Sequence, residues 1–228
     1  MQSPEKFEHT SQLQVSLREL YGPDADGLLD RLQRLSGHHR DGPSDAWSEH
    51  DAWLITYPDQ FRSGDRAPLQ VLEDVYLAHF ADSLNGVHVL PCYPWTSDDG
   101  YAVTDYLEID PAFGTWRDVE HLAARTRLML DAVINHMSAS SAWFTSFLAG
   151  DPDFADFFRT SSPDADLAAT VRPRATPLLT EFESAHGSKW VWTTFSADQV
   201  DLDVRNPKVF ESVANVLFEY ARHGAQMI

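Results

Sequence analysis

The sequence predicts an α/β fold in which a parallel sheet is connected by helical crossovers. Short apolar runs, typical of buried strands, alternate along the chain with amphipathic stretches of helical period. The 228 residues are 43% apolar and 12% aromatic, which is enough for a sizeable core and argues against intrinsic disorder. No run approaches the ~18 apolar residues of a membrane span, so no membrane partner is expected.

The first segment, 1–36, is expected to be a helical extension. Leucines recur at helical spacing on both sides of Gly22 and Pro23, which divide it into two amphipathic helices. Residues 37–51 are polar and aperiodic, and we interpret them as a linker. The pair His38-His39 has no further metal ligand at useful spacing, so a solvated loop is the favoured interpretation.

Residues 52–137 are predicted to hold three strands: Trp53–Tyr57, Gly86–Pro91 and Leu128–Ile134. The periodicity predicts a helix over 68–84, with Gly86 as its C′ residue. A capping box between Thr115 and Asp118 indicates a second helix, which continues through Ala124.

Between 138 and 200 the alternation stops. This stretch is rich in aromatic residues, Pro and Asp, and is expected to form a small inserted domain after the third strand. The segment 201–228 returns to the sheet, because Asn206 and Pro207 are typical of a helix N-terminus. We expect this helix to bury Phe210, Val213, Leu217 and Tyr220 and to be followed by the start of a fourth strand.

The residues after the first strand exclude a common class of parallel-sheet protein. Pro58 to Phe61 contain neither GxGxxG nor GxxxxGK, so a nucleotide-binding sheet is not supported. The pattern alone leaves an open sheet and a closed barrel as alternatives. A closed barrel typically takes ~250 residues, whereas three complete strand–helix units occur here.

The net charge and the cysteine content limit the classes of binding partner and the cellular compartments that fit this chain. The formal net charge of -18 argues against nucleic acid partners, because the phosphate backbone would be repelled. The stretch from Met1 to Glu8 lacks the basic and apolar regions of a secretory signal. The single cysteine, Cys92, fits a reducing cytoplasm, and we interpret it as a buried apolar residue rather than a nucleophile.

The hexapeptide Asp131–His136 resembles the first signature region of the α-amylase superfamily, glycoside hydrolase family 13. Further segments resemble, in the same order, its sucrose phosphorylase branch: Trp53–Tyr57, Gly86–Pro91, Ser97–Tyr101, Arg172–Arg174, Val191–Phe195 and Gln199–Asp203. Within this branch, glucosylglycerate and sucrose 6-phosphate phosphorylases resemble the chain more than the shorter sucrose phosphorylases do. The similarity lies in the helical extension and in the segments SDDGYAVTDY and RPRATPLLT.

The resemblance implies a partial (β/α)8 barrel with three βα units, the start of strand 4 and a small domain inserted after strand 3. It implies an active site at the carboxyl ends of the strands. The implied reaction moves a glucosyl unit onto inorganic phosphate with retention and gives α-glucose 1-phosphate, without a cofactor. Such chemistry needs two carboxylates about 5 Å apart. In the family these follow the fourth and fifth strands, beyond Ile228, so no catalytic residue is assigned and the 228-residue chain alone is expected to be inactive.

Four residues match sugar- or phosphate-binding positions of the family. By resemblance His136 and Asp98 hydrogen-bond sugar hydroxyls, Tyr101 stacks on the sugar, and Arg174 approaches the phosphate or the acceptor. The plainer alternatives are a core histidine, an Asp-Gly turn, a packing aromatic and an arginine paired with a surface Asp. The neighbours Asp99 and Arg172 could take the roles of Asp98 and Arg174.

The remaining polar signature residues, Asp131, Asn135, Asp201 and Asp203, are interpreted as braces. Gln199–Asp203 could suggest calcium ligation as in many amylases, but no metal site is expected. Two alternatives to the phosphorylase stay open. One is a hydrolase or transglucosidase of the same superfamily, and the other is an inactive fragment or a carbohydrate-binding remnant.

Overall fold

The structure of the chain, a computed structural model, describes residues 4–36, 48–171 and 174–228. Most of the predicted linker, including the pair His38-His39, lies outside these residues, as does Arg172. Within them, no helix is long and apolar enough to cross a membrane.

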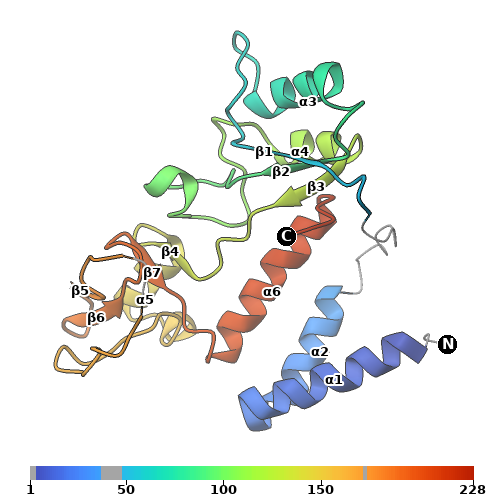
Figure 1. Ribbon diagram of the computed structural model, residues 1–228. Helices are drawn as coiled ribbons and strands as arrows, with labels where there is room; N and C mark the ends of the chain where they lie inside the picture. The colour runs from blue at the N-terminus through green and yellow to red at the C-terminus, as the bar shows by residue number, and fades with distance from the viewer. Residues whose placement is uncertain (1–3, 37–47, 172–173) are drawn as a thin grey trace.

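A parallel sheet forms the centre of the chain (Figure 1). Its strands are β1 (Trp53–Thr56), β2 (Gly86–Val89) and β3 (Arg127–Leu130), in the order β1-β2-β3. The chain returns beside β3 at its end, where Met227 bridges Met129 in parallel. The predicted α/β fold with parallel strands is confirmed, and at the predicted start of a fourth strand the structure has this single bridge.

The helix α3 (Pro68–His79) is shorter than the predicted 68–84. It ends because the Tyr76 carbonyl accepts hydrogen bonds from the backbone N–H groups of both Phe80 and Ala81, at 2.9 and 3.0 Å. Gly86 is not its C′ residue but the first residue of β2. A Cβ at Gly86 would lie 2.4 Å from the Trp53 ring, so the glycine makes room for that indole.

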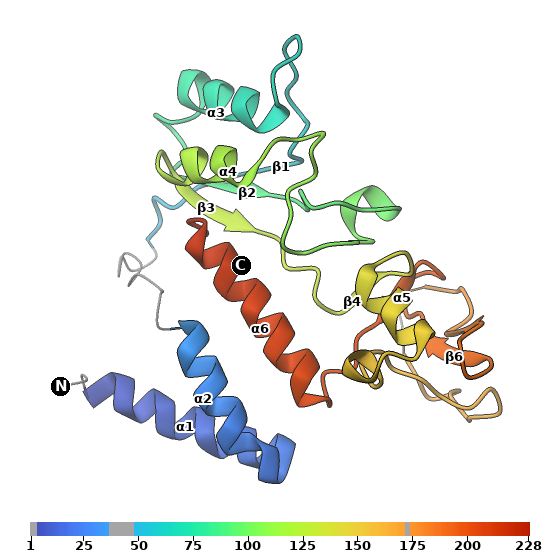
Figure 2. The ribbon, with the colours of Figure 1, turned by 180° about the vertical axis from the view of Figure 1, so that it is seen from behind.

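The helix α4 (Trp116–Ala123) lies beside α3 on one side of the sheet (Figure 2). Its predicted capping box is present, because the Asp118 carboxylate accepts from both the backbone N–H and the hydroxyl of Thr115, each at 2.8 Å. The box fixes the direction in which the chain enters α4 and therefore the path back to β3.

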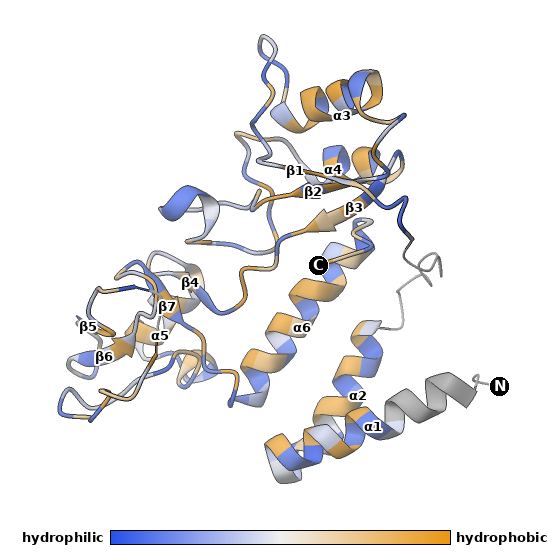
Figure 3. Cartoon of the chain, in the orientation of Figure 1, coloured by the Kyte–Doolittle hydropathy of each residue, from blue (hydrophilic) through white to orange (hydrophobic). Residues whose placement is uncertain are grey.

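The helix α6 (Pro207–Arg222) begins as predicted, with the Asn206 side chain accepting from the N–H of Lys208 at 2.9 Å. Its buried face includes the expected Val213 and Tyr220, whereas Phe210 and Leu217 are only half-buried. The residues buried on α6 are Val209, Val213, Val216 and Tyr220. Phe210 instead packs, together with Ala214, against the N-terminal helices. The helix therefore has two apolar faces, and apolar residues occur on more than one side of it in Figure 3.

The N-terminal segment forms the two predicted helices, α1 (Pro4–Tyr21) and α2 (Ala25–Ser36), joined by the short helix η1 (Gly22–Asp24). Their contact with α6 buries a separate small core of Leu17, Ala25, Leu28, Leu29 and Leu32. Two polar contacts add to it, from the Tyr21 hydroxyl to the Val204 carbonyl at 2.7 Å and from Arg31 to Glu211 at 2.6 Å.

The stretch between β3 and α6 forms a lobe beside the sheet (Figure 1). It contains β4 (His136–Ser138), α5 (Ala142–Ala149), η3 (Pro152–Phe154), β5 (Leu179–Phe182), β6 (Lys189–Trp192) and β7 (Gln199–Asp201). β4 pairs with β7, and β5 pairs with β6, both antiparallel. The prediction that one strand runs to Ile134, with His136 at its end, is wrong. β3 ends at Leu130, and His136 opens a new strand because its backbone pairs with Asp201 in the lobe.

A candidate sugar-binding cavity

The four residues that the sequence singled out, Asp98, Tyr101, His136 and Arg174, line one cavity of about 520 Å³. The cavity lies where the strands of the sheet end. Tyr57 follows β1, Asp98 follows β2, and Asp131 follows β3, and all three line it. Ligands of parallel α/β proteins bind at this edge of the sheet, beyond the carboxyl ends of the strands.

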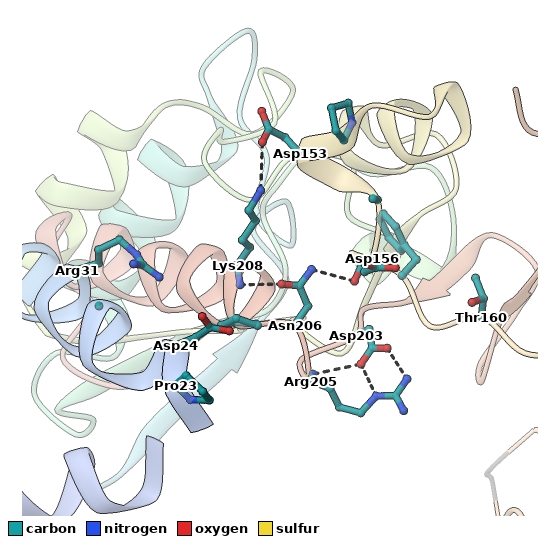
Figure 4. Close-up of a pocket in the computed structure, with 15 residues that line it drawn as sticks. Pro23, Asp24, Arg31, Asp153, Asp156, Thr160, Asp203, Arg205, Asn206 and Lys208 are labelled. Atoms are coloured by element: carbon teal, nitrogen blue, oxygen red, sulfur yellow. Dashed lines mark hydrogen bonds and ion pairs between the residues drawn. The ribbon is translucent and has the colours of Figure 1, made fainter. Parts of the chain in front are cut away.

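A larger cavity, of about 970 Å³, lies between the N-terminal helices, η3 and the start of α6 (Figure 4). None of the four predicted residues lines it. The cations among its described lining residues are already paired. Arg31 contacts Glu211 at 2.6 Å, Arg205 contacts Asp203 at 2.5 Å, and Lys208 contacts Asp153 at 3.1 Å. We therefore place the functional site in the smaller cavity.

Asp98 is presented to the cavity by a tight turn, the short helix η2 (Asp98–Gly100). Both Asp98 and Asp99 have left-handed backbones, with φ of 58° and 51°, a conformation that aspartate tolerates better than most residues. Gly100 is required because a Cβ there would lie 3.1 Å from Pro91. The structure thus contains the turn that the plainer alternative predicted, and the same turn directs the Asp98 carboxylate toward Gln199.

The Asp98 carboxylate contacts two side chains from the lobe. Its Oδ2 accepts a hydrogen bond from Gln199 Nε2 at 3.0 Å and lies 3.7 Å from Arg174 Nη2. Arg174 is more than half exposed, so this ion pair is wet, and its guanidinium makes no hydrogen bond to another residue that the structure describes. Arg174 does pair with an aspartate, as the plainer alternative predicted, but that aspartate is Asp98, which lines the same cavity.

His136 is a buried wall of the cavity, with only 4% of its surface exposed. Its Nε2 lies 2.8 Å from the Tyr101 carbonyl, which can only accept, so Nε2 carries the proton. Nδ1 is buried and has no hydrogen-bond partner among the described residues. Burial lowers the pKa of His136, although the Tyr101 carbonyl and the nearby carboxylates oppose this shift. The ring is therefore neutral at pH 7.

Tyr101 and Asp131 form a second polar wall. The Tyr101 hydroxyl donates to Asp131 Oδ2 at 3.2 Å, and His88 Nε2 lies 2.9 Å from Asp131 Oδ1. Burial, together with the charge of Asp131, raises the pKa of Tyr101 to about 12, so the hydroxyl keeps its proton. Asp131 braces two elements as expected, and it also lines the cavity, which the sequence interpretation did not foresee.

Several functional residues were missed or given another role. Gln199 is buried, and its amide reaches both Asp98 and the Tyr101 carbonyl, at 3.0 and 3.4 Å. Tyr57 and Phe195 add aromatic surface to the cavity. Gln199, Tyr57 and Phe195 all lie in segments that resemble the family, which was the available signal for them. Phe195 lies 59 positions after His136, and no local pattern places their rings 4.9 Å apart.

Two of the predicted braces, Asp201 and Asp203, make local contacts. Asp201 accepts from the N–H of Thr194 at 3.2 Å and from its hydroxyl, and Asp203 binds Arg205. These bonds satisfy carboxylates that could otherwise serve calcium. In the part of the chain that the structure describes, no three His, Cys, Asp or Glu side chains gather as a metal site would require.

The cavity combines the groups that a polyhydroxylated ligand with an anionic partner needs. Carboxylates accept hydroxyl donors, aromatic rings offer apolar faces, and a partly free guanidinium suits a bidentate anion. Residues 57–226 match the alpha-amylase family, described as "Alpha amylase, catalytic domain". The chain belongs to the α-amylase family. The resemblance stated from the signature segments is thereby confirmed.

Similar proteins of the family are phosphorylases. The chain is 46% identical to a glucosylglycerate phosphorylase of Allomeiothermus silvanus over 96% of its length and 40% of that protein. It is 33% identical to a sucrose phosphorylase of Streptococcus mutans over 77% of its length and 38% of that protein. The crystal structure of sucrose 6F-phosphate phosphorylase from Thermoanaerobacter thermosaccharolyticum superposes with a TM-score of 0.71 at 32% identity, covering 82% of this chain and 41% of that one. The chain thus spans about 40% of the length of these relatives.

Proposed function

We propose that the protein carrying this chain is a retaining disaccharide phosphorylase that transfers a glucosyl unit to inorganic phosphate and releases α-glucose 1-phosphate. The observation that carries the proposal is the convergence of Asp98, Tyr101, His136 and Arg174 on one cavity at the strand ends. They come from three separate segments, since Asp98 and Tyr101 lie on the loop after β2, His136 on β4 and Arg174 between η3 and β5, and an unrelated fold would have no reason to gather them.

In this proposal the chain supplies sugar binding and phosphate or acceptor recognition. Asp98 accepts hydroxyl protons of the glucosyl ring, and the neutral His136 forms the adjoining wall and contacts a ring hydroxyl. Tyr101, held by Asp131, packs against the sugar, and Arg174 faces the anion. Bond cleavage is assigned to none of these residues, because Asp98 and Asp131 are both engaged by protein partners.

The proposal includes a barrel. Three parallel strands, the bridge between Met129 and Met227, and the likeness to a solved phosphorylase support the interpretation that β1, β2 and β3 begin a (β/α)8 barrel. The lobe corresponds to the inserted domain predicted over 138–200. We also place the protein in the cytoplasm, on the basis of its single, buried cysteine.

For the substrate we propose glucosylglycerate. The 46% identity to a glucosylglycerate phosphorylase extends over nearly the whole chain, including the N-terminal helices, whereas the sucrose phosphorylase covers 77%. Sucrose 6-phosphate is the second candidate, since the relative of known structure is named for it.

The test is the phosphate dependence of product formation by the purified full-length protein that carries this chain, not by the 228-residue chain alone. Incubated with glucosylglycerate, it should release α-glucose 1-phosphate only when inorganic phosphate is added, and sucrose and sucrose 6-phosphate serve as competing donors. Free glucose formed at the same rate without phosphate would replace the proposal with a hydrolase. No turnover of any of the three donors would contradict it.

A further inference from the structure

Outside the cavity, one carboxylate joins three segments that are far apart in the sequence. Asp198 Oδ2 accepts hydrogen bonds from the hydroxyls of Thr96 and Ser97, at 2.7 and 2.5 Å. Its Oδ1 accepts from the Ser138 hydroxyl at 3.1 Å and from the backbone N–H of Ala139 at 3.2 Å. The backbone repeats the connection, because the Ala139 N–H also donates to the Asp198 carbonyl at 2.8 Å.

Each residue whose side chain takes part in the tether is one or two positions from a residue of the sugar cavity. Ser97 precedes Asp98, Ser138 follows His136 by two positions on β4, and Asp198 precedes Gln199. None of the tethered residues lines the cavity itself. Asp198 can therefore influence a bound sugar only through the residues beside it.

The chemistry of this cluster favours a rigid tether. An ionised carboxylate can only accept, so both hydroxyls of the loop after β2 must turn their protons toward it, which fixes their rotamers. Such charge-assisted bonds are stronger than neutral ones. The hydroxyl oxygens of Thr96 and Ser138 also lie 2.7 Å apart. Because Thr96 donates its one proton to Asp198, the Ser138 hydroxyl donates either to Thr96 or to Asp198, and either bond keeps the cluster connected.

The loop after β2 needs such a tether. It contains two consecutive left-handed aspartates, and that conformation persists only where surrounding contacts hold it. On the lobe side, the pairing of β4 with β7 places Ser138 opposite Gln199. Asp198 thus connects a strained loop to a regular strand pair and sets the position of Asp98 relative to His136 and Gln199.

We propose that Asp198 is a positioning residue of the sugar cavity, which holds the loop carrying Asp98 against the strand pair carrying His136 and Gln199. The inference rests on the proposed function, since it assumes that this cavity binds a glucosyl unit. Its consequences for the loop and for glucose affinity can be measured without phosphorolysis.

The test compares the purified wild-type protein with Asp198→Ala, with Ser97→Ala and with Ser97→Thr. The control is Asp166→Ala, an exposed aspartate of the lobe whose one hydrogen bond among the described residues is from the nearby N–H of Ala168. Ser97 is extended, with φ of -156° and ψ of 175°, so threonine fits and keeps the hydroxyl. The readouts are the dissociation constant of glucose and the hydrogen exchange of amides 96–102.

We expect Asp198→Ala to weaken glucose binding about tenfold and to speed exchange in 96–102 by a similar factor. Ser97→Ala should cause a smaller change in the same direction, while Ser97→Thr and Asp166→Ala should match the wild type. Unchanged exchange in Asp198→Ala, or faster exchange with unchanged glucose affinity, would overturn the inference. A wild type that binds glucose but forms no α-glucose 1-phosphate would refute only the proposed function, and one that does not bind glucose would refute both.

Discussion

At the scale of single residues, the cavity depends on groups whose protonation is fixed by burial. His136 illustrates this, because its Nε2 proton is donated to the Tyr101 carbonyl and its buried Nδ1 has no partner among the described residues. A second proton would have to sit on Nδ1, where no described acceptor could receive it. The folded state therefore contains the neutral ring, so the free energy of unfolding should depend on pH.

We expect the stability of the chain to fall on acidification because of His136. Its pKa is lowered from 6.5 in the folded state, so below pH 6.5 the unfolded chain binds the proton more readily. The free energy of unfolding should be independent of this group above about pH 7 and should decrease between pH 6.5 and the lowered pKa, by at most about 1.4 kcal/mol per pH unit. Denaturant unfolding from pH 5 to pH 8 measures the slope.

The matched variant for this experiment is His136→Gln, which cannot titrate. It should remove the His136 part of the slope between about pH 5 and pH 6.5, whatever its effect on absolute stability. Carboxylates with lowered pKa values, such as Asp118 and Asp203, lose their stabilising effect at lower pH and should not interfere. An identical slope in the variant would show that His136 titrates normally in the folded chain.

Individual site residues could be predicted from the sequence where they belong to a family motif. Asp98, Tyr101, His136 and Arg174 were named from local wording, and the structure gathers them in one cavity, although their proposed roles stay predictions. Asp198 was not foreseen. Its hydrogen bonds reach back 59 to 102 positions, and a single sequence gives no indication of contacts at such separations.

At the scale of elements, two glycines differ in what a side chain would do. At one the packing leaves no room for a Cβ, whereas at the other the main effect is on helix propensity. Gly86 opens β2 beneath the Trp53 ring, where a Cβ would meet the indole at 2.4 Å. Gly27 lies within α2, where a Cβ would meet only the mobile end of Arg31, at 3.3 Å. The same change from glycine to alanine should therefore have opposite effects at the two positions.

We expect Gly86→Ala to destabilise the chain by about 1–3 kcal/mol, because the sheet must move away from Trp53. Gly27→Ala should stabilise it by about 0.5–1 kcal/mol, because alanine loses less backbone entropy in a helix. Equilibrium unfolding in urea gives both values. A stabilised Gly86→Ala would contradict the tight packing of Gly86 against Trp53, and a destabilised Gly27→Ala would show that the Arg31 side chain does not make room for a Cβ.

Element boundaries show where local pattern was insufficient. The capping box of α4 and the N-cap of α6 were predicted because each is a contact within a few residues. The ends of α3 and β3 were not. Apolar residues continue past Leu130 to Ile134, but the chain leaves the sheet there because His136 pairs with Asp201, 65 positions later. Likewise, the two apolar faces of α6 became distinct only once α2 was seen to pack against it.

At the scale of the whole molecule, the excess of acidic residues acts on every element at once. The chain has 35 Asp and Glu against 17 Lys and Arg, a formal net charge of -18. The ion pairs are mostly exposed, for example Arg18 with Asp26 and Arg66 with Asp74, so they contribute little. Self-repulsion of the compact state should therefore outweigh them at low ionic strength.

We accordingly expect added salt to stabilise the chain. As the Debye length falls from about 30 Å at 0.01 M to about 8 Å at 0.15 M, repulsion between distant carboxylates is screened first. The melting temperature should rise by roughly 3 °C over that range and then level off, since a gain of about 1 kcal/mol shifts a chain of this size by 2–4 °C. Calorimetry in sodium chloride and in sodium sulfate at equal ionic strength separates screening from salt-specific effects. Equal curves in the two salts would indicate screening, whereas a falling melting temperature would show that the surface ion pairs outweigh the net charge.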